Sequence, residues 1–169
     1  MTIRLATGAD TAGVAEVHVR SWQAAYRGHL PDRVLDGLSV ERRALLWRSF
    51  VDAGRPGEHL FVVVEDDSVT GFAHAGVCRD PAAPPNTGEI SSIYLVPEVW
   101  GTGLGRALMQ TCVDQMTADG HRAAVLWVLV TNARARRFYE AAGWACDEAV
   151  KSEEMVGTTV VETRYRRSL

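Results

Sequence analysis

Apolar side chains recur along the chain at two different spacings, and this difference separates expected helices from expected strands. Apolar residues three or four positions apart predict helices, and short apolar runs bounded by turn residues predict strands. The first expected helix begins after the capping residues 7–10 and ends near residue 26. Further helices are expected over residues 40–53, 103–119 and 133–142. Expected strands cover residues 3–6, 60–65, 69–78, 89–96, 121–130, 144–151 and 158–166.

The order of these elements predicts an α/β fold. A turn-like Asp66-Asp67-Ser68 joins two strands into an antiparallel hairpin. The strand over 121–130 is apolar throughout after Arg122, which is typical of a central strand buried on both faces. The helix over 40–53 is expected to bury a stripe made of Leu45, Leu46, Trp47 and Phe50. The whole pattern predicts a sheet of mixed direction with crossover helices on its faces.

Composition indicates one domain over residues 1–169, with 47% hydrophobic and 23% charged residues. With a net charge of −3, the chain lacks the excess of basic residues that is typical of a nucleic-acid-binding protein. The three cysteines form neither a CxxC pair nor a cluster with zinc spacing, so we expect free thiols and no metal. The first ten residues do not resemble a signal peptide, and the longest apolar run, 123–130, is too short to span a bilayer. These features predict a cytoplasmic protein without a membrane partner.

The glycine-rich turn Trp100-Gly101-Thr102-Gly103-Leu104-Gly105-Arg106 follows an expected strand and opens an expected helix. Glycines let the backbone approach a ligand closely, and the free amides of a helix start favour a phosphate or pyrophosphate. The turn lacks the Gly-Lys-Ser/Thr of a Walker A loop, and its GxGxG spacing differs from the GxGxxG of dinucleotide-binding folds. The glycines alone are also compatible with a purely structural turn that binds no ligand.

Two segments together resemble the GNAT N-acetyltransferase superfamily. The glycine turn resembles that family's Q/R-x-x-G-x-G/A signature, and residues 132–144 resemble its N-x-x-A-x-x-F-Y-E-x-x-G-F signature. Their order, separation and strand or helix context fit, and the resemblance covers most of the chain. Trp100 departs from the usual Gln or Arg, and Trp144 replaces the common Phe. The resemblance implies a mostly antiparallel sheet in which strands 89–96 and 122–130 run parallel and splay apart.

The resemblance also implies acetyl-CoA as acyl donor, with its pantetheine arm in the gap between the splayed strands. Asn132 would contact the donor, and would also serve as a plain helix N-cap. The residues expected to bind the donor are Ile93, Tyr94, Leu95, Val96, Trp100, Gly101, Thr102, Gly103, Leu104, Gly105, Arg106, Asn132, Arg136 and Tyr139.

Acetyl transfer to an amine places three demands on side chains. The amine, with a pKa of about 10, must lose a proton, the developing oxyanion needs a donor, and the departing thiolate benefits from a proton. The resemblance assigns Tyr139 as general acid. Glu89, acting through water, is the expected base, and His74 is the alternative because its ordinary pKa suits the task. Trp22, Tyr26, His74 and Glu89 are expected to form the pocket for a small-molecule or peptide amine.

Three other interpretations stay open on the sequence. A non-catalytic acyl-CoA sensor would keep the glycine turn without needing Tyr139, a nucleotide-binding protein would use the same turn, and a longer acyl donor is compatible with everything above. The identity of the amine is not encoded in any motif. Family members often dimerise, so a homodimer involving residues 158–169 is an expectation by analogy.

Overall fold

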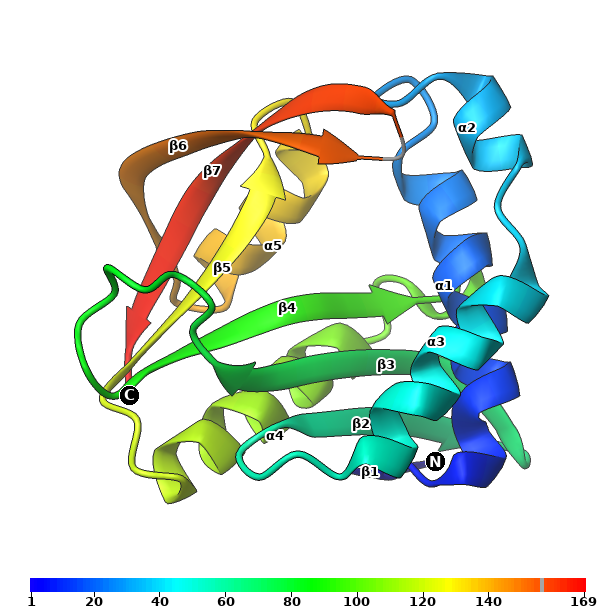
Figure 1. Ribbon diagram of the computed structural model, residues 1–169, viewed down its shortest axis with the longest axis horizontal. Coiled ribbons are helices and arrows are strands. Elements are labelled where there is room, and N and C mark those ends of the chain that lie inside the picture. The colour runs from blue at the N-terminus through cyan, green and yellow to red at the C-terminus, as the bar shows by residue number, and fades with distance from the viewer. Residues whose placement is uncertain (156) are drawn as a thin grey trace.

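The computed structural model describes residues 1–155 and 157–169 and shows a seven-stranded sheet in the order β1-β2-β3-β4-β5-β7-β6 (Figure 1). The parallel pair is β4 and β5, and the other paired neighbours are antiparallel. The strands are β1 (Thr2–Leu5), β2 (His59–Glu65), β3 (Ser68–Val77), β4 (Thr87–Leu95), β5 (Ala123–Leu129), β6 (Ala145–Met155) and β7 (Thr158–Ser168). The mixed sheet and its parallel pair confirm the expected fold class.

The helices are α1 (Thr11–Ala25), α2 (Asp32–Asp36), α3 (Val40–Ala53), α4 (Leu104–Ala118) and α5 (Ala133–Ala141), with short 3-10 turns η1 (Gly8–Asp10) and η2 (Pro97–Val99). Helix α4 begins after Gly103, and Gly120, just beyond its C-terminal end, has a φ of +88°, a conformation that favours glycine. Across the described part of the chain, no helix combines the length and the apolar character that a bilayer crossing requires.

The two faces of the sheet carry separate clusters of buried side chains. Helices α4 and α5 pack on one face, where Leu108 is fully buried against β-strand residues such as Ala124. Helices α1 and α3 pack on the other face, around Phe72 of β3. Clusters of this kind remove apolar surface from water at about 25 cal/mol per Å² and fix the sheet between its helices.

The expected stripe of α3 is wrong in part. Trp47, Phe50 and Val51, spaced i, i+3 and i+4, pack on the cluster around Phe72, but Leu45 is 73% exposed and Leu46 is 61% exposed. Successive helical residues are rotated by about 100°, so these two leucines lie outside the sector that faces α1 and the sheet.

The sheet opens between its two parallel strands (Figure 1). Strands β4 and β5 pair only from Thr87–Ala123 to Glu89–Val125, and beyond that point the backbones diverge. A β-bulge lies just past it in β4, because His74 of β3 faces Ser92 whereas the next residue, Ala75, faces Ile90. Ser91 is the extra residue of this bulge.

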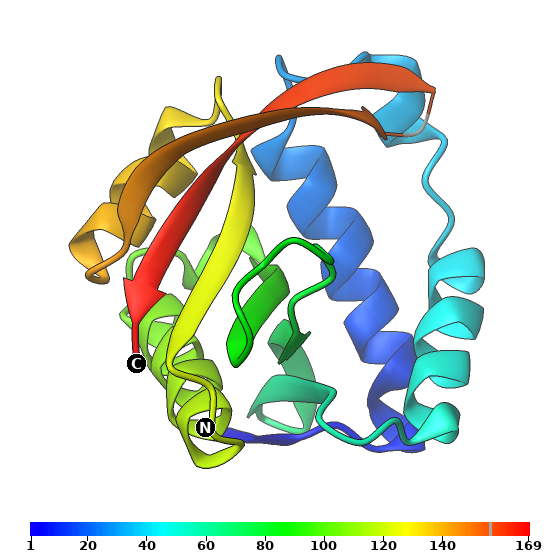
Figure 2. The ribbon, with the colours of Figure 1, turned by 60° about the vertical axis from the view of Figure 1, so that its left-hand side comes forward.

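The β6–β7 hairpin arches over the opening and reaches α2 (Figure 2). Val160, near the tip of the hairpin, packs with Leu30, which precedes α2, and with Leu35, which lies in α2. This contact explains two differences from the expected elements: β6 continues to Met155, beyond the expected end at 151, and α2 was not expected at all. The opening is therefore bounded by α1 and α2 on one side and by the hairpin on the other.

Candidate active site

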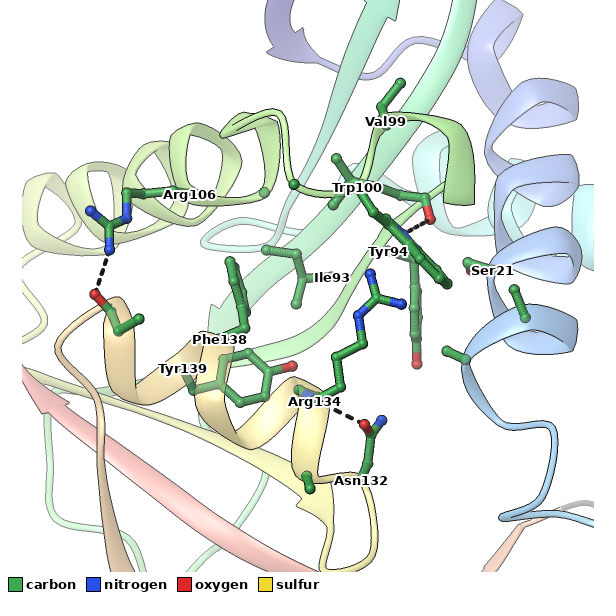
Figure 3. A pocket seen from close by; sticks show the side chains of 18 of the residues that line it. Ser21, Ile93, Tyr94, Val99, Trp100, Arg106, Asn132, Arg134, Phe138 and Tyr139 are labelled. Atoms are coloured by element: carbon green, nitrogen blue, oxygen red, sulfur yellow. Dashed lines mark hydrogen bonds between the residues drawn. The ribbon is translucent and has the colours of Figure 1, made fainter.

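A cavity of about 700 Å³ fills the opening between the diverging strands (Figure 3). It is bounded by the end of β4, the glycine turn, the first turns of α5 and the C-terminal end of α1. Among the residues expected to bind the donor, those that line it are Ile93, Tyr94, Leu95, Trp100, Gly101, Gly103, Gly105, Arg106, Asn132 and Tyr139. Val96 and Leu104 are instead buried in the core clusters, and the Thr102 hydroxyl donates to the carbonyl of Val99.

The glycine turn leaves the N-terminal amides of α4 without a side-chain cap. Gly101 and Gly103 have φ of +79° and +92°, values that strain other L-residues, and a Cβ at either position would meet no atom within 4 Å. Glycine is therefore required here for backbone conformation. Gly103 is the N-cap of α4 and offers no side-chain acceptor, whereas Ser39 caps α3. The first amides of α4 are thus available to an anion, as a phosphate site requires.

Trp100 and Arg134 form a stacked pair at this cavity. The Arg134 Cζ lies 3.5 Å from the centroid of the Trp100 ring, and the indole Nε1 donates to the carbonyl of Leu95 at 2.8 Å. Figure 3 shows the guanidinium between Trp100 and Asn132. Partial burial lowers the pKa of Arg134 below its ordinary value, although it remains a cation at neutral pH. Trp100, which stands where Gln or Arg was expected, therefore provides an aromatic ring on which the Arg134 guanidinium stacks in the groove.

The other arginines near the groove are already engaged. Arg106 reaches the rim, but its Nη2 donates to the carbonyl of Ala141 at the end of α5. Arg136, which was expected to bind the donor, lies outside the cavity, where its Nε donates to the Tyr165 hydroxyl at 3.1 Å and its Nη1 to the Val130 carbonyl. Arg134 takes the place in the groove that was expected of Arg136, because the two side chains point to different sides of α5.

Helix α5 presents two polar groups to the cavity. Asn132 caps the helix, since its Oδ1 accepts from the amide of Ala135 at 3.1 Å, which confirms the expected N-cap and leaves Nδ2 free to donate into the cavity that the residue lines. Tyr139 points its hydroxyl into the same space (Figure 3). Burial raises the pKa of Tyr139 above its ordinary value, and the neighbouring Tyr94 and Glu162 raise it further. The phenol therefore stays protonated through neutral pH.

A second cavity, of about 100 Å³, continues on the other side of the opening. It shares Tyr94 and Tyr139 with the large cavity and adds Tyr26, Ser91 and Trp127 to the lining. The hydroxyls of Tyr26 and Tyr94 are 3.5 Å apart, and burial raises the pKa of both. Because Tyr139 borders both spaces, a group bound in one lies next to a group bound in the other. We call this second space the acceptor-side pocket.

The residues expected to bind the amine are placed unevenly around this pocket. Tyr26 lines it, and Trp22 packs behind Tyr26 with ring centroids 5.0 Å apart. His74 lies behind Ser91 and does not line either cavity, with its Nδ1 2.5 Å from the Ser91 hydroxyl oxygen. Glu89 is 4% exposed, also lies outside both cavities, and is bonded to the backbone amide and the guanidinium of Arg79. Its carboxylate is therefore held by a cation in this structure.

Sequence reasoning missed Arg134, Ser91 and Trp127 as cavity residues. The sequence carried no signal for Arg134, because helical spacing of three and four from the expected residues Asn132 and Tyr139 selects Arg136, and only the structure shows that Phe138, four residues after Arg134, also lines the cavity. Ser91 carried no comparable signal either, because the bulge that it occupies is not encoded in a local pattern. Among the residues that the structure describes, no group of three or more histidine, cysteine or acidic side chains is arranged to hold a metal ion.

The residues of the large cavity fit a CoA thioester: uncapped amides and Arg134 for its phosphates, and a long groove beside β4 for its pantetheine arm. Comparison with known proteins agrees with this fit. The model of the Acetyltransferase (GNAT) family matches residues 17–144. The uncharacterized N-acetyltransferase YuaI of Bacillus subtilis (strain 168) is 31% identical over 133 residues, which cover 78% of this chain and 73% of YuaI.

Two further proteins extend the match. The L-amino acid N-acyltransferase MnaT of Escherichia coli (strain K12) is 29% identical over 85% of this chain and 79% of its own length. The solved structure of YncA from Salmonella typhimurium with its cofactor acetyl-CoA has a TM-score of 0.74 and 26% identity, and covers 99% of this chain and 93% of YncA. The chain therefore belongs to the GNAT family of N-acetyltransferases.

Proposed function

We propose that this enzyme moves the acetyl group of acetyl-CoA directly to an amine while donor and acceptor are bound together. Acetyl-CoA supplies an activated acyl group as a thioester. The observation that carries the proposal is the position of Tyr139, whose side chain borders both the large cavity and the acceptor-side pocket. Direct transfer needs the two reactants to meet beside one proton donor, and this residue marks the place.

The donor is held by groups from three elements. The uncapped amides at the start of α4 and the guanidinium of Arg134 face the phosphates, because both favour negative charge. Asn132 offers its Nδ2, and the edge of β4 from Ile93 to Leu95 lines the rest of the groove. The carbonyl of Leu95 already accepts from Trp100, so we expect the pantetheine arm to pair with other backbone groups of β4.

Tyr139 acts as the general acid that protonates the departing sulfur. Its raised pKa keeps the phenol protonated at neutral pH, so that the form able to donate a proton is present when negative charge develops on the sulfur. Glu89, the base expected from the sequence, is bound to Arg79 and lies outside both cavities. We therefore assign Glu89 to holding the β3–β4 connection rather than to proton transfer.

The acceptor is an amine that enters from the side of α1, α2 and the β6–β7 hairpin. Aromatic side chains dominate this entrance: Tyr26, Tyr94 and Trp127 line the pocket, and such rings bind the alkyl part of an amine and its cation. The name of the MnaT relative supports L-amino acids as the first acceptors to try. Polyamines, peptide N-termini and lysine side chains complete the panel.

The test is thiol release from acetyl-CoA with this amine panel, comparing the wild type with Tyr139→Phe. We expect one amine class to support turnover, with kcat reduced about 100-fold or more in the variant because a positioned acid contributes about that much. Initial rates that give intersecting double-reciprocal lines support direct transfer. Parallel lines together with an acetylated protein in the mass spectrum would refute it.

Two further properties are proposals with simple tests. The cysteines Cys78, Cys112 and Cys146 are free thiols, which supports a cytoplasmic location that cell fractionation checks. Strand β7 pairs with β5 and β6 on its two sides, so a homodimer built on the sheet would add a strand at β6 rather than use residues 158–169 directly. Light scattering on the purified enzyme measures the oligomeric state.

A further inference from the structure

Three polar side chains form a row that starts at the acceptor-side pocket and ends at the edge of the molecule. Ser91 lines the pocket, and its Oγ lies 2.5 Å from Nδ1 of His74. On the far side of the imidazole ring, Nε2 of His74 lies 2.7 Å from Oε2 of Glu58, an ion-pair contact that is not aligned as a hydrogen bond. The His74 side chain is 14% exposed and that of Glu58 is 22% exposed.

The surroundings are shaped to hold this row. Gly76 follows His74 on β3, and a Cβ at Gly76 would lie 2.1 Å from Oε2 of Glu58, so only glycine lets the carboxylate lie across the strand. Phe50 of α3 covers the imidazole in an edge-on contact with ring centroids 4.7 Å apart. Ser91, in the bulge of β4, lies against the Nδ1 side of the ring. Three separate elements thus fix the orientation of one histidine.

We propose that Ser91, His74 and Glu58 form a relay that removes the proton of the acceptor amine from the acceptor-side pocket. This inference rests on the proposed acetyl transfer to an amine. Ser91 is the member that touches the amine, whereas His74 and Glu58 act through it. The Ser91 hydroxyl donates to Nδ1 of His74, so its oxygen lone pairs remain available to an N–H of the amine.

The proton balance requires such an exit. An alkylammonium that becomes an amide loses two protons, of which one ends on the CoA thiol and the other leaves the protein. As the amine passes a proton to Ser91 Oγ, the hydroxyl proton moves to Nδ1, and the imidazole becomes an imidazolium that Glu58 stabilises. Nε2 then passes its proton to the Glu58 carboxylate, which exchanges it with solvent, and the ring regains the Nε2–H tautomer by proton exchange before the next turnover. The nitrogen keeps its electron pair, which forms the new C–N bond while the C–S bond breaks.

The charges around His74 suit this role. Burial lowers the pKa of His74 below its ordinary value, Glu58 and Glu89 raise it, and Arg79 lowers it. The net pKa is lowered, so the imidazole is neutral at pH 7 and can accept a proton. A carboxylate that orients a histidine, which in turn activates a hydroxyl, is an arrangement that enzymes use for proton transfer.

The kinetic test follows kcat/KM for the amine selected by the panel from pH 6 to pH 10. We expect Ser91→Ala and His74→Gln to lower it about 100-fold at pH 7. The loss should shrink as the pH approaches the amine pKa of about 10, where solvent deprotonates the amine. Ser91→Thr restores the hydroxyl and most of the rate. Ser68→Ala, at an exposed serine of β3 that lines neither cavity, should leave kcat/KM at the wild-type value at every pH. A loss equal at every pH would overturn the relay.

A second measurement is independent of turnover. Imidazole ¹⁵N–¹H spectra of the free enzyme should show His74 as the Nε2–H tautomer, and Glu58→Gln should lower its pKa because a carboxylate charge is removed. Gly76→Ala should act in the same direction by displacing Glu58. An Nδ1–H tautomer in the wild type would overturn the proposal, since Nδ1 could not accept. If the spectra agree but no amine is acetylated, the proposed function fails while the arrangement of the row stands.

Discussion

Replacing Arg134 by alanine tests how the groove holds the phosphates of CoA. In the structure its guanidinium stacks on Trp100 at 3.5 Å and lines the same cavity as the glycine turn. A hydrogen bond to a charged group contributes about 1.5–3 kcal/mol, which corresponds to roughly 10- to 150-fold in Kd. We therefore expect Arg134→Ala to weaken CoA binding by one to two orders of magnitude.

Trp100 should contribute less to the affinity for CoA than the Arg134 guanidinium that stacks on it. A stacked arginine is stabilised by about 0.5–1 kcal/mol, so Trp100→Ala should raise the Kd of CoA by only about 2- to 5-fold. In the double variant the two effects should not add, because the tryptophan acts through the arginine. Calorimetry with CoA measures all three values.

S-acetylpantetheine is the matched control ligand, because it lacks the phosphates. Its affinity should be unchanged in Arg134→Ala. Arg137→Ala is the matched control protein, since it removes the same charge from an exposed position of the same helix that does not line the cavity. Equal weakening of CoA and S-acetylpantetheine by Arg134→Ala, or equal effects of the two arginine variants on CoA, would refute a phosphate contact.

Three further predictions address the fold and the role of Glu89. Glu89→Gln should change kcat by less than about 3-fold from the wild-type value at 25 °C. It should lower the free energy of unfolding, measured by urea denaturation, by about 3 kcal/mol, because it weakens the pairing of a buried carboxylate with Arg79. A 100-fold loss of kcat would contradict this. Asp10→Asn should cost about 1–2 kcal/mol at pH 7, because Asp10 caps the Thr7 amide and pairs with Arg4. These contacts lower the pKa of Asp10, so their contribution to the free energy of unfolding is fully present above the unfolded-state pKa of about 4 and is lost as the pH falls further. If Asp10→Asn were still less stable than the wild type at pH 1, this reasoning would be wrong. Leu108→Ala, at a fully buried position, should cost about 2–5 kcal/mol in the same denaturation assay, and a change below 1 kcal/mol would mean that the core can refill the space.

Local chemistry explains why most residues that line the large cavity were predictable. The glycines of the turn indicate their own backbone conformation, and Asn132 indicates a helix start, so each could be assigned without knowing the rest of the fold. The choice between Arg134 and Arg136 was not local, because Arg136 has helical spacing from both Asn132 and Tyr139. Only the contacts of Arg136 with Tyr165 and Val130 show that its side chain lies outside the cavity.

The acceptor side depends on contacts that join distant parts of the chain. The β6–β7 hairpin extends through the polar segment around Glu153 because its strands pair with each other and its tip packs on α2, and no local pattern records either contact. Likewise, Glu89 was an attractive base as a carboxylate on the central strand. Its partner Arg79 lies ten residues earlier and meets it only because β3 and β4 pair.

The bulge in β4 links the opening of the sheet to the chemistry proposed there. Side chains of a regular strand alternate between its faces, so if Ser91 held an ordinary paired position, Ile93 would turn toward α1 and α3, and Tyr94 toward α4. With the bulge, Ile93 packs toward α4, Tyr94 lies on the face of Phe72, and Ser91 points toward His74. A bulge also bends its strand, and this one lies directly after Glu89, where β4 leaves β5. The bulge thus accounts for the faces to which Ile93 and Tyr94 turn, it lies where the two strands part, and both side chains line the large cavity.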